Sequence, residues 1–92
     1  MEIHHEEGET KGRFFIELDG AETAELTYSK AGPERIIIDH TQVNDENRGE
    51  GLGKKLVHHA VNYAREHELT VLPLCPYARS VISSDASLQD VL

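Results

Sequence analysis

Apolar and polar residues alternate along the first part of the chain with the period of two that is typical of β-strands. Residues 13–18 and 23–28 follow this pattern on either side of Asp19-Gly20, which is a two-residue hairpin signal. A shorter polar segment, Ile3–Glu7, also has the character of a strand. The pattern therefore predicts a β-hairpin that is preceded by one further strand.

A fourth strand is predicted over Arg35–Val43, where the run Ile36-Ile37-Ile38 contains no polar residue. An apolar run without alternation is typical of a strand that is central in its sheet and buried on both faces. From Gly51 to about His67 the apolar period becomes that of a helix. The apolar stripe of this helix comprises Leu52, Leu56, Ala60 and Ala64.

A fifth strand over Leu69–Cys75 completes a strand–helix–strand unit, and such a crossover places its two strands parallel. Pro73 cannot donate to a ladder, so one edge is predicted to be unpaired there. Pro76 begins a second predicted helix, since proline is favoured in the first turn, and Asp85–Leu92 is predicted to add a short helical turn. The 92 residues are expected to form a single domain, residues 1–92, with a small core.

Between the fourth strand and the first helix lies Arg48-Gly49-Glu50-Gly51-Leu52-Gly53, followed by Lys54-Lys55. Glycines let the backbone turn its N–H groups toward an anion without interference from a Cβ atom. The first turn of a helix adds N–H groups without internal partners and a partial positive charge. Together with the basic side chains, these groups predict a phosphate-binding loop. For Arg48 the alternative role is a surface charge that pairs with the carboxylate of Glu46 or Glu50.

Two common phosphate-binding patterns do not fit this loop. The ATP loop Gly-x4-Gly-Lys-Ser/Thr would need glycine in place of Arg48 and a hydroxyl in place of Lys55. The dinucleotide pattern Gly-x-Gly-x-x-Gly would need glycine in place of Lys54. The pattern Arg-x-x-Gly-x-Gly does fit, and it resembles the pyrophosphate loop of the GCN5-related N-acetyltransferases, which hold acetyl-coenzyme A.

The resemblance covers nearly all of residues 35–77, including His40-Thr41-Gln42-Val43 and Pro73-Leu74-Cys75-Pro76-Tyr77. It implies a small single-domain branch of that superfamily in the α/β (α+β) class. The implied fold is minimal: a mixed, mainly antiparallel sheet with helices packed on it, whose fourth and fifth strands are parallel and splayed around acetyl-coenzyme A. The cofactor-binding residues implied by the loop and by the resemblance are Thr41, Gln42, Val43, Arg48, Gly49, Glu50, Gly51, Leu52, Gly53, Lys54, Lys55, Cys75 and Tyr77.

Acetyl transfer needs groups that move protons and hydrogen-bond donors for the thioester carbonyl. Cys75 precedes a helix start, where a thiol pKa is lowered. It is therefore a candidate catalytic residue that accepts the acetyl group, and the alternative is a buried thiol that fills the core. His40, beside the acetyl position that the resemblance implies, is a candidate general base; the alternative is a hydrogen-bonded structural histidine. No metal site is predicted.

The chain departs from larger members of the family at the position of their usual acid. Their second helix often carries Asn-x-x-Ala-x-x-x-Tyr, and alignment on Ala78 places Cys75 at the asparagine and Ile82 at the tyrosine. Tyr77 is the nearest tyrosine to that position. The helices that build the acceptor site in larger members also have no counterpart. The pattern therefore supports cofactor binding better than efficient transfer.

The net charge is −8, and the excess of acidic residues lies within residues 1–46. This charge argues against a nucleic-acid partner. The acidic residues either form an ordinary solvated surface or create an electrostatic field that attracts a cationic acceptor. No apolar run is long enough to span a membrane, no signal segment opens the chain, and a single cysteine suits a reducing compartment, so a cytoplasmic location is expected.

Two functions follow from these patterns as alternatives. The first is an acetyl-coenzyme A-dependent N-acetyltransferase that transfers acetyl to an amine or thiol acceptor, either a small molecule or a protein. The second is a non-catalytic module that binds coenzyme A or acyl-coenzyme A. The two alternatives share the cofactor and differ in whether an acceptor reacts.

Overall fold

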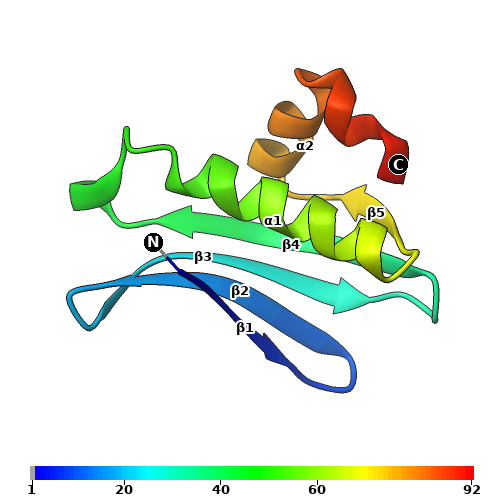
Figure 1. Cartoon of the computed structure of the whole chain (residues 1–92), viewed down its shortest axis with the longest axis horizontal. Coiled ribbons are helices and arrows are strands. Elements are labelled where there is room, and N and C mark those ends of the chain that lie inside the picture. Colours follow the sequence, from blue (N-terminus) through cyan, green and yellow to red (C-terminus); the bar gives the residue numbers. More distant parts are fainter. Residues whose placement is uncertain (1) are drawn as a thin grey trace.

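Five strands lie side by side in chain order and form one mixed sheet in the computed structural model of this protein, which describes residues 2–92 (Figure 1). The strands are β1 (Ile3–Glu7), β2 (Lys11–Leu18), β3 (Ala21–Lys30), β4 (Arg35–Val43) and β5 (Thr70–Pro73). The first four pair antiparallel, and β5 pairs parallel to β4. This arrangement confirms the predicted α/β (α+β) class with a mixed, mainly antiparallel sheet.

The helical segments are found between and after the last two strands. They are the 3-10 turn η1 (Asp45–Asn47), helix α1 (Leu52–Glu66), helix α2 (Pro76–Ser83) and the 3-10 helix η2 (Ala86–Val91). Pro76 begins α2 as predicted, whereas Gly51 is the N-cap of α1 and not its first residue. Within residues 2–92, no helix has the length and apolar character needed to cross a membrane.

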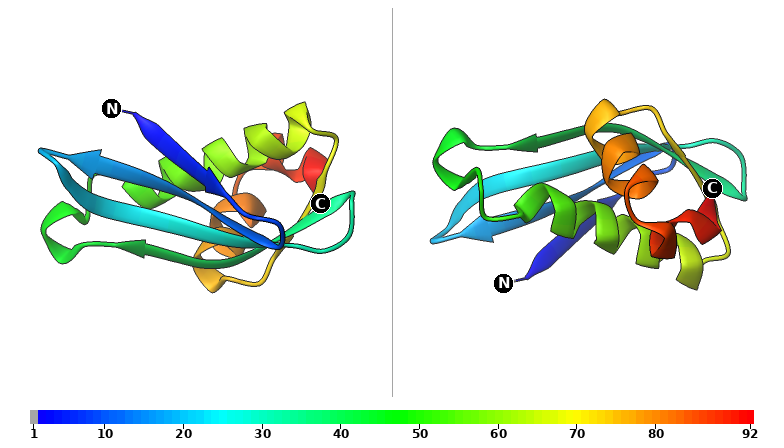
Figure 2. Two further views of the ribbon diagram at one scale, coloured as in Figure 1. Left: turned by 90° about the horizontal axis from the view of Figure 1, so that it is seen from below. Right: turned by 90° about the horizontal axis from the view of Figure 1, so that it is seen from above.

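The helices cover one face of the sheet, and the hydrophobic core lies between them and the strands (Figure 2). The predicted apolar stripe of α1 is fully buried, since its four residues are at most 1% exposed. The sheet contributes Phe14, Ile16, Leu26, Tyr28, Ile36 and Ile38 to this core. In the described part of the chain, no helix covers the other face, which we call the open face.

The prediction that Ile36-Ile37-Ile38 is buried on both faces is wrong for its middle residue. Ile36 and Ile38 are buried against the helices, but Ile37 is only partly buried, opposite Leu72 of β5. The strand is central, between β3 and β5, yet helices cover only one of its two faces. The strand β5 is also shorter than the predicted segment 69–75, because its ladder ends at Pro73.

A β-bulge in β4 decides which of its later residues face the helices. The ladder to β3 passes from Ile38 to His40 and skips Asp39, which is the extra residue. Side chains alternate along a strand, so the bulge places Thr41 and Val43 on the helix side and His40 on the open face. Without the bulge, the two sets would be exchanged.

The ring of His5 packs on the helix side of β1, although the residue as a whole is exposed. Its Nε2 atom lies 2.6 Å from the hydroxyl of buried Tyr28, and the ring stacks on Phe14. Burial lowers the pKa of His5 from its ordinary value of 6.5. Glu7 opposes this shift, and the charges that reinforce it are those of His59, His67 and Lys30. The folded state therefore favours the neutral imidazole.

Acidification is expected to destabilise the protein through His5. A lowered folded-state pKa means that the stabilisation is complete above the unfolded-state pKa and is lost as pH falls through the folded-state pKa. We expect the free energy of unfolding, measured with urea, to fall as pH drops below about 6.5. The His5→Gln variant cannot titrate and should lose less stability over the same interval. An equal loss in both proteins would assign the effect to other groups.

Candidate cofactor site

Strands β4 and β5 separate at one end, which confirms the predicted parallel and splayed pair. Their last paired residues are Ile38 and Pro73. The N–H groups of Leu74 and Cys75 then both donate to the carbonyl oxygen of Ile38, at 3.1 Å, so the chain turns away from the ladder. As a consequence, residues 39–43 of β4 present a strand edge that β5 does not pair.

A pocket of about 610 Å³ lies beside this edge and beside the glycine loop. The predicted residues that line it are His40, Thr41, Gln42, Val43, Arg48, Gly49, Gly51, Leu52, Gly53 and Tyr77. Asn47 lines it too, and its side-chain amide donates to the Glu50 carboxylate at 3.2 Å. Asn47 is not among the predicted site residues. The one signal that could have identified it as a pocket residue is its position directly before the Arg-x-x-Gly-x-Gly pattern. The predicted strand, loop and second helix therefore meet in one pocket.

The glycine loop contains two residues with a left-handed backbone conformation. Gly49 and Gly51 have φ angles of 89° and 75°, in the left-handed region that favours glycine. The first bond within α1 runs from the Lys55 N–H to the Gly51 carbonyl, and Gly51 has no side chain to cap the helix. The N–H groups of residues 52–54 therefore precede the first helical hydrogen bond and can receive an anion.

Gly53 and Tyr77 bring the two helices together at the pocket. A Cβ atom on Gly53 would lie 2.9 Å from Cε2 and 3.0 Å from the hydroxyl of Tyr77, closer than real side chains approach. The tyrosine ring thus rests directly on the first turn of α1 while remaining 44% exposed. Only glycine at position 53 permits this contact, and it leaves the tyrosine hydroxyl in the pocket wall.

Cys75 lies behind the pocket, as the N-cap of α2. The residue is 5% exposed, and its Sγ atom is 3.6 Å from Oγ1 of Thr41. Burial by itself raises the pKa of this thiol, but the N–H of Ala78, the hydroxyl of Thr41 and the N–H groups of Tyr77 and Thr41 outweigh burial. The pKa of Cys75 is therefore below its ordinary value, and the fold stabilises a thiolate next to a residue that lines the pocket.

Some residues of the predicted set lie outside this pocket. Lys54 and Lys55 line a neighbouring hollow between α1 and the start of β1, together with Ile3, Gly51, His58, His59 and Asn62. Arg48 lines the pocket, and its side chain, which is 73% exposed, pairs with Asp45 at 3.2 Å. The partner of that ion pair is therefore neither Glu46 nor Glu50. The pocket thus keeps one basic side chain at the loop, and both lysines stand beside it.

The two candidate catalytic residues, His40 and Cys75, are not brought together. The Cys75 thiol contacts Thr41 on the helix side of β4, whereas strand alternation places the His40 side chain on the open face. Residues from both faces of β4 line the pocket. Gln42 lies on the open face with His40, and Val43 lies on the helix side with Thr41. It therefore connects the helix side of the sheet with the open face at the free edge of β4.

Known proteins are similar to this chain in sequence and in fold. Protein NATD1 of Xenopus tropicalis is 27% identical over 84 residues, which cover 90% of this chain and 77% of that protein. The solution structure of a GCN5-like protein from Staphylococcus aureus is 40% identical, with a TM-score of 0.74, over 98% of this chain and 85% of that one.

A more distant structure shares the fold and contains a ligand. It is a Bacillus anthracis protein assigned as a streptothricin acetyltransferase, solved in complex with acetyl coenzyme A. It is 18% identical with a TM-score of 0.62, and the match covers 72% of this chain and 38% of that one. The sequence profile described as GCN5-related N-acetyl-transferase matches residues 13–91. The chain therefore belongs to the GCN5-related N-acetyltransferase family.

Proposed function

We propose that this protein binds acetyl-coenzyme A in the pocket between β4, the glycine loop and α2, and transfers its acetyl group to an amine acceptor. The observation that carries the proposal is the junction of a free strand edge at residues 39–43, unpaired helical N–H groups at residues 52–54 and the Tyr77 ring on Gly53. Acetyl-coenzyme A would supply an activated acetyl thioester. The complex of the Bacillus anthracis relative with this cofactor supports the choice of ligand.

Each part of the pocket suits one part of the cofactor. The N–H groups around Gly51–Lys54, with Arg48 beside them, offer hydrogen bonds and positive charge to the pyrophosphate. The free edge of β4 offers backbone N–H and carbonyl groups to an extended amide-containing arm. Tyr77 and Thr41 place hydroxyl groups in the same wall, and the Thr41 hydroxyl hydrogen-bonds the Cys75 thiol.

A non-catalytic coenzyme A-binding module is the second candidate, and one residue favours it. Ile82, at the position where larger family members often carry the tyrosine acid, is 1% exposed and belongs to the core. It can neither donate a proton nor reach the pocket. Release of free coenzyme A thiol in the presence of a panel of amines distinguishes the two functions, because a binding module releases none.

Replacement of Gly53 by alanine tests the cofactor pocket. The added methyl group must displace the exposed Tyr77 ring from the first turn of α1, so we expect the affinity for coenzyme A, measured by calorimetry, to fall by about 1–2 kcal/mol, the scale of a lost charge-assisted hydrogen bond. The free energy of unfolding should not fall in parallel, because alanine is a better helix former than glycine by about 1 kcal/mol.

Two control variants separate the pocket from the rest of α1. Glu66→Ala changes an exposed residue at the far end of the helix and should leave the affinity for coenzyme A unchanged. Tyr77→Ala removes the ring that the new methyl group would meet, so Gly53→Ala should cost less affinity in that background. Binding of coenzyme A that is equally tight in Gly53→Ala and in the parent would contradict the assignment of this pocket.

A further inference from the structure

The open face of the sheet carries a cluster of carboxylates beside the cofactor pocket. This part of the open face is called the acidic face, and it carries Glu6, Glu17, Glu22, Glu25 and Asp39. We propose that the acidic face docks a lysine-rich polypeptide segment, so that the amine acceptor is a lysine-bearing protein segment. The proposal rests on the transferase function proposed above and specifies its acceptor.

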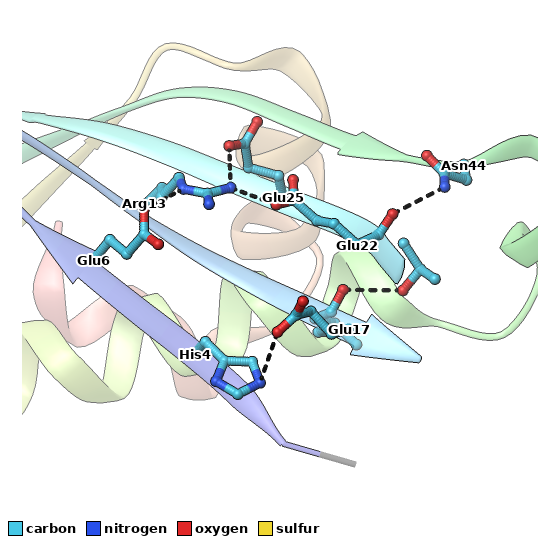
Figure 3. Close-up of polar contacts among 9 residues, drawn as sticks. His4, Glu6, Arg13, Glu17, Glu22, Glu25 and Asn44 are labelled. Carbon is cyan, nitrogen blue, oxygen red and sulfur yellow. Dashed lines mark hydrogen bonds and ion pairs between the residues drawn. The ribbon is translucent and has the colours of Figure 1, made fainter. Parts of the chain in front are cut away.

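Strand register places these carboxylates in neighbouring rows on one side of the sheet. Glu6 and Arg13 share a row with Thr27 and His40, and the next row contains Glu25 and Gln42. A third row contains Glu17 and Glu22. Figure 3 shows most of these side chains together on the strands, with the helices behind the sheet. The rows are therefore one continuous surface.

The acidic face has a large excess of negative charge. The guanidinium of Arg13 lies within the acidic face and pairs with the carboxylates of Glu6, Glu22 and Glu25 at 2.7–2.9 Å. It also lies over the ring of Phe15. Among residues 2–92, the four carboxylates of the three rows and the bulge residue Asp39, which lies beside Ser29, face this one cation. The other open-face bases, Lys11 and Arg35, lie in rows near the opposite end of the strands. A cationic partner would complement this charge.

One pair of carboxylates is placed where it costs stability. Glu17 and Glu22 lie directly opposite each other on adjacent strands, and like charges in that arrangement destabilise a sheet. Arg13 reaches Glu22, whereas Glu17 has the imidazole of His4 at 3.6 Å. A sequence usually breaks a local stability rule where a function requires it. A bound lysine side chain would remove this repulsion.

The acidic face also leads to the place where acetyl transfer is proposed. His40 and Gln42 follow the open-face phase of β4 and line the cofactor pocket. A segment lying across the rows therefore ends at the free edge of β4, where the pocket opens. His40, as an imidazole at that boundary, is placed to accept a proton from an amine that arrives from the open face.

The shape of the surface favours a polypeptide over a small polyamine. The rows span four strands, and toward β5 they give way to Ile37 and Leu72, which lie opposite each other on the open face. Leu72 is 40% exposed. A polyamine could satisfy the carboxylates but would leave these apolar side chains in water, whereas a peptide can supply both charged and apolar side chains.

Binding of a labelled peptide with alternating lysine and glycine residues, followed by fluorescence anisotropy, tests the proposal. A matched peptide with glutamine in place of lysine is the ligand control. Glu17→Lys should weaken binding of the lysine peptide by about three- to tenfold at low ionic strength, the scale of one to two exposed ion pairs. Because Glu17→Lys turns a like-charge pair into an opposite-charge pair, the variant is expected to fold.

Glu66→Lys is the matched protein control, because it makes the same change in net charge on α1, away from the open face. Equal weakening by both variants, or no weakening by Glu17→Lys, would overturn the proposal. Spermine that competes with the peptide at equal affinity would overturn it in favour of a small polyamine. Calorimetry with coenzyme A should give the same affinity for the parent and for Glu17→Lys. Failure of the parent to bind coenzyme A would contradict the cofactor pocket and, with it, the role of the docked segment as acetyl acceptor. The peptide-binding result does not depend on the cofactor, so it would still test the docking surface.

Discussion

Gly12→Ala is expected to lower the free energy of unfolding by about 2–4 kcal/mol, from overpacking and a lost hydrogen bond. A Cβ atom at this position would lie 2.3 Å from the hydroxyl and 2.4 Å from Cζ of Tyr28. The Tyr28 ring cannot move into solvent, because it is fully buried in the core and its hydroxyl is held by His5. Thermal unfolding should show the loss as a fall in midpoint of roughly 10–20 °C for a domain of this size.

A double-mutant cycle with Tyr28→Leu identifies the cause of this loss. Leucine lacks the far part of the ring that the new methyl group would meet, so Gly12→Ala should cost much less in the Tyr28→Leu background. The ring is therefore the source of strain only if the two effects are strongly non-additive. The same cost in both backgrounds would locate the strain elsewhere in the β1–β2 hairpin.

Local signals predicted most of this fold because each depends on a few neighbouring residues. Asp19 and Gly20 have φ angles of 53° and 78°, as a tight two-residue hairpin requires. Pro76 starts α2 because its missing N–H and fixed φ suit a first turn. Five residues of the predicted loop line the pocket, Arg48, Gly49, Gly51, Leu52 and Gly53, whereas Glu50 does not. The glycines set the backbone of this loop without help from distant residues.

The features that could not be predicted depend on contacts between distant segments. No residue type marks Asp39 as a bulge, because the bulge arises from the pairing of β4 with β3. It nevertheless decides that Thr41, and not His40, faces Cys75. The contact of Tyr77 with Gly53 depends on the packing of α2 against α1. The partial exposure of Ile37 depends on which face of the sheet the helices cover.

The reactivity of Cys75 separates a transferase that uses an acyl carrier from one in which the amine attacks directly. We expect incubation with acetyl-coenzyme A to give one acetyl adduct by intact mass, and Cys75→Ala to abolish it while still binding coenzyme A. In that step the thiolate attacks the thioester carbonyl, a new carbon–sulfur bond forms as the old one breaks, and coenzyme A leaves as a thiolate that takes a proton from water. One thioester replaces another, so the step has little thermodynamic cost.

The hydroxyl of Thr41 provides a second test that does not remove the thiol. It lies 3.6 Å from the Cys75 sulfur and helps to hold the pKa of Cys75 below its ordinary value. Thr41→Val keeps the shape of the side chain and removes the hydroxyl, so the pKa of the thiol should rise. The rate of adduct formation, followed against pH, should then reach its half-maximum at a higher pH than in the parent.

The combination of outcomes assigns the role of Cys75. If the acetyl group of the adduct then passes to an added amine, the thiol is an acyl carrier. Such a carrier would compensate for the acid that is absent at Ile82. No adduct together with full transfer by Cys75→Ala would leave the thiol as a packing residue of the core and would make direct attack by the amine the mechanism. No adduct and no transfer to any amine, with coenzyme A still bound, would identify the protein as a coenzyme A-binding module, because the pocket needs Gly53, Tyr77 and the free edge of β4 but not a reactive sulfur.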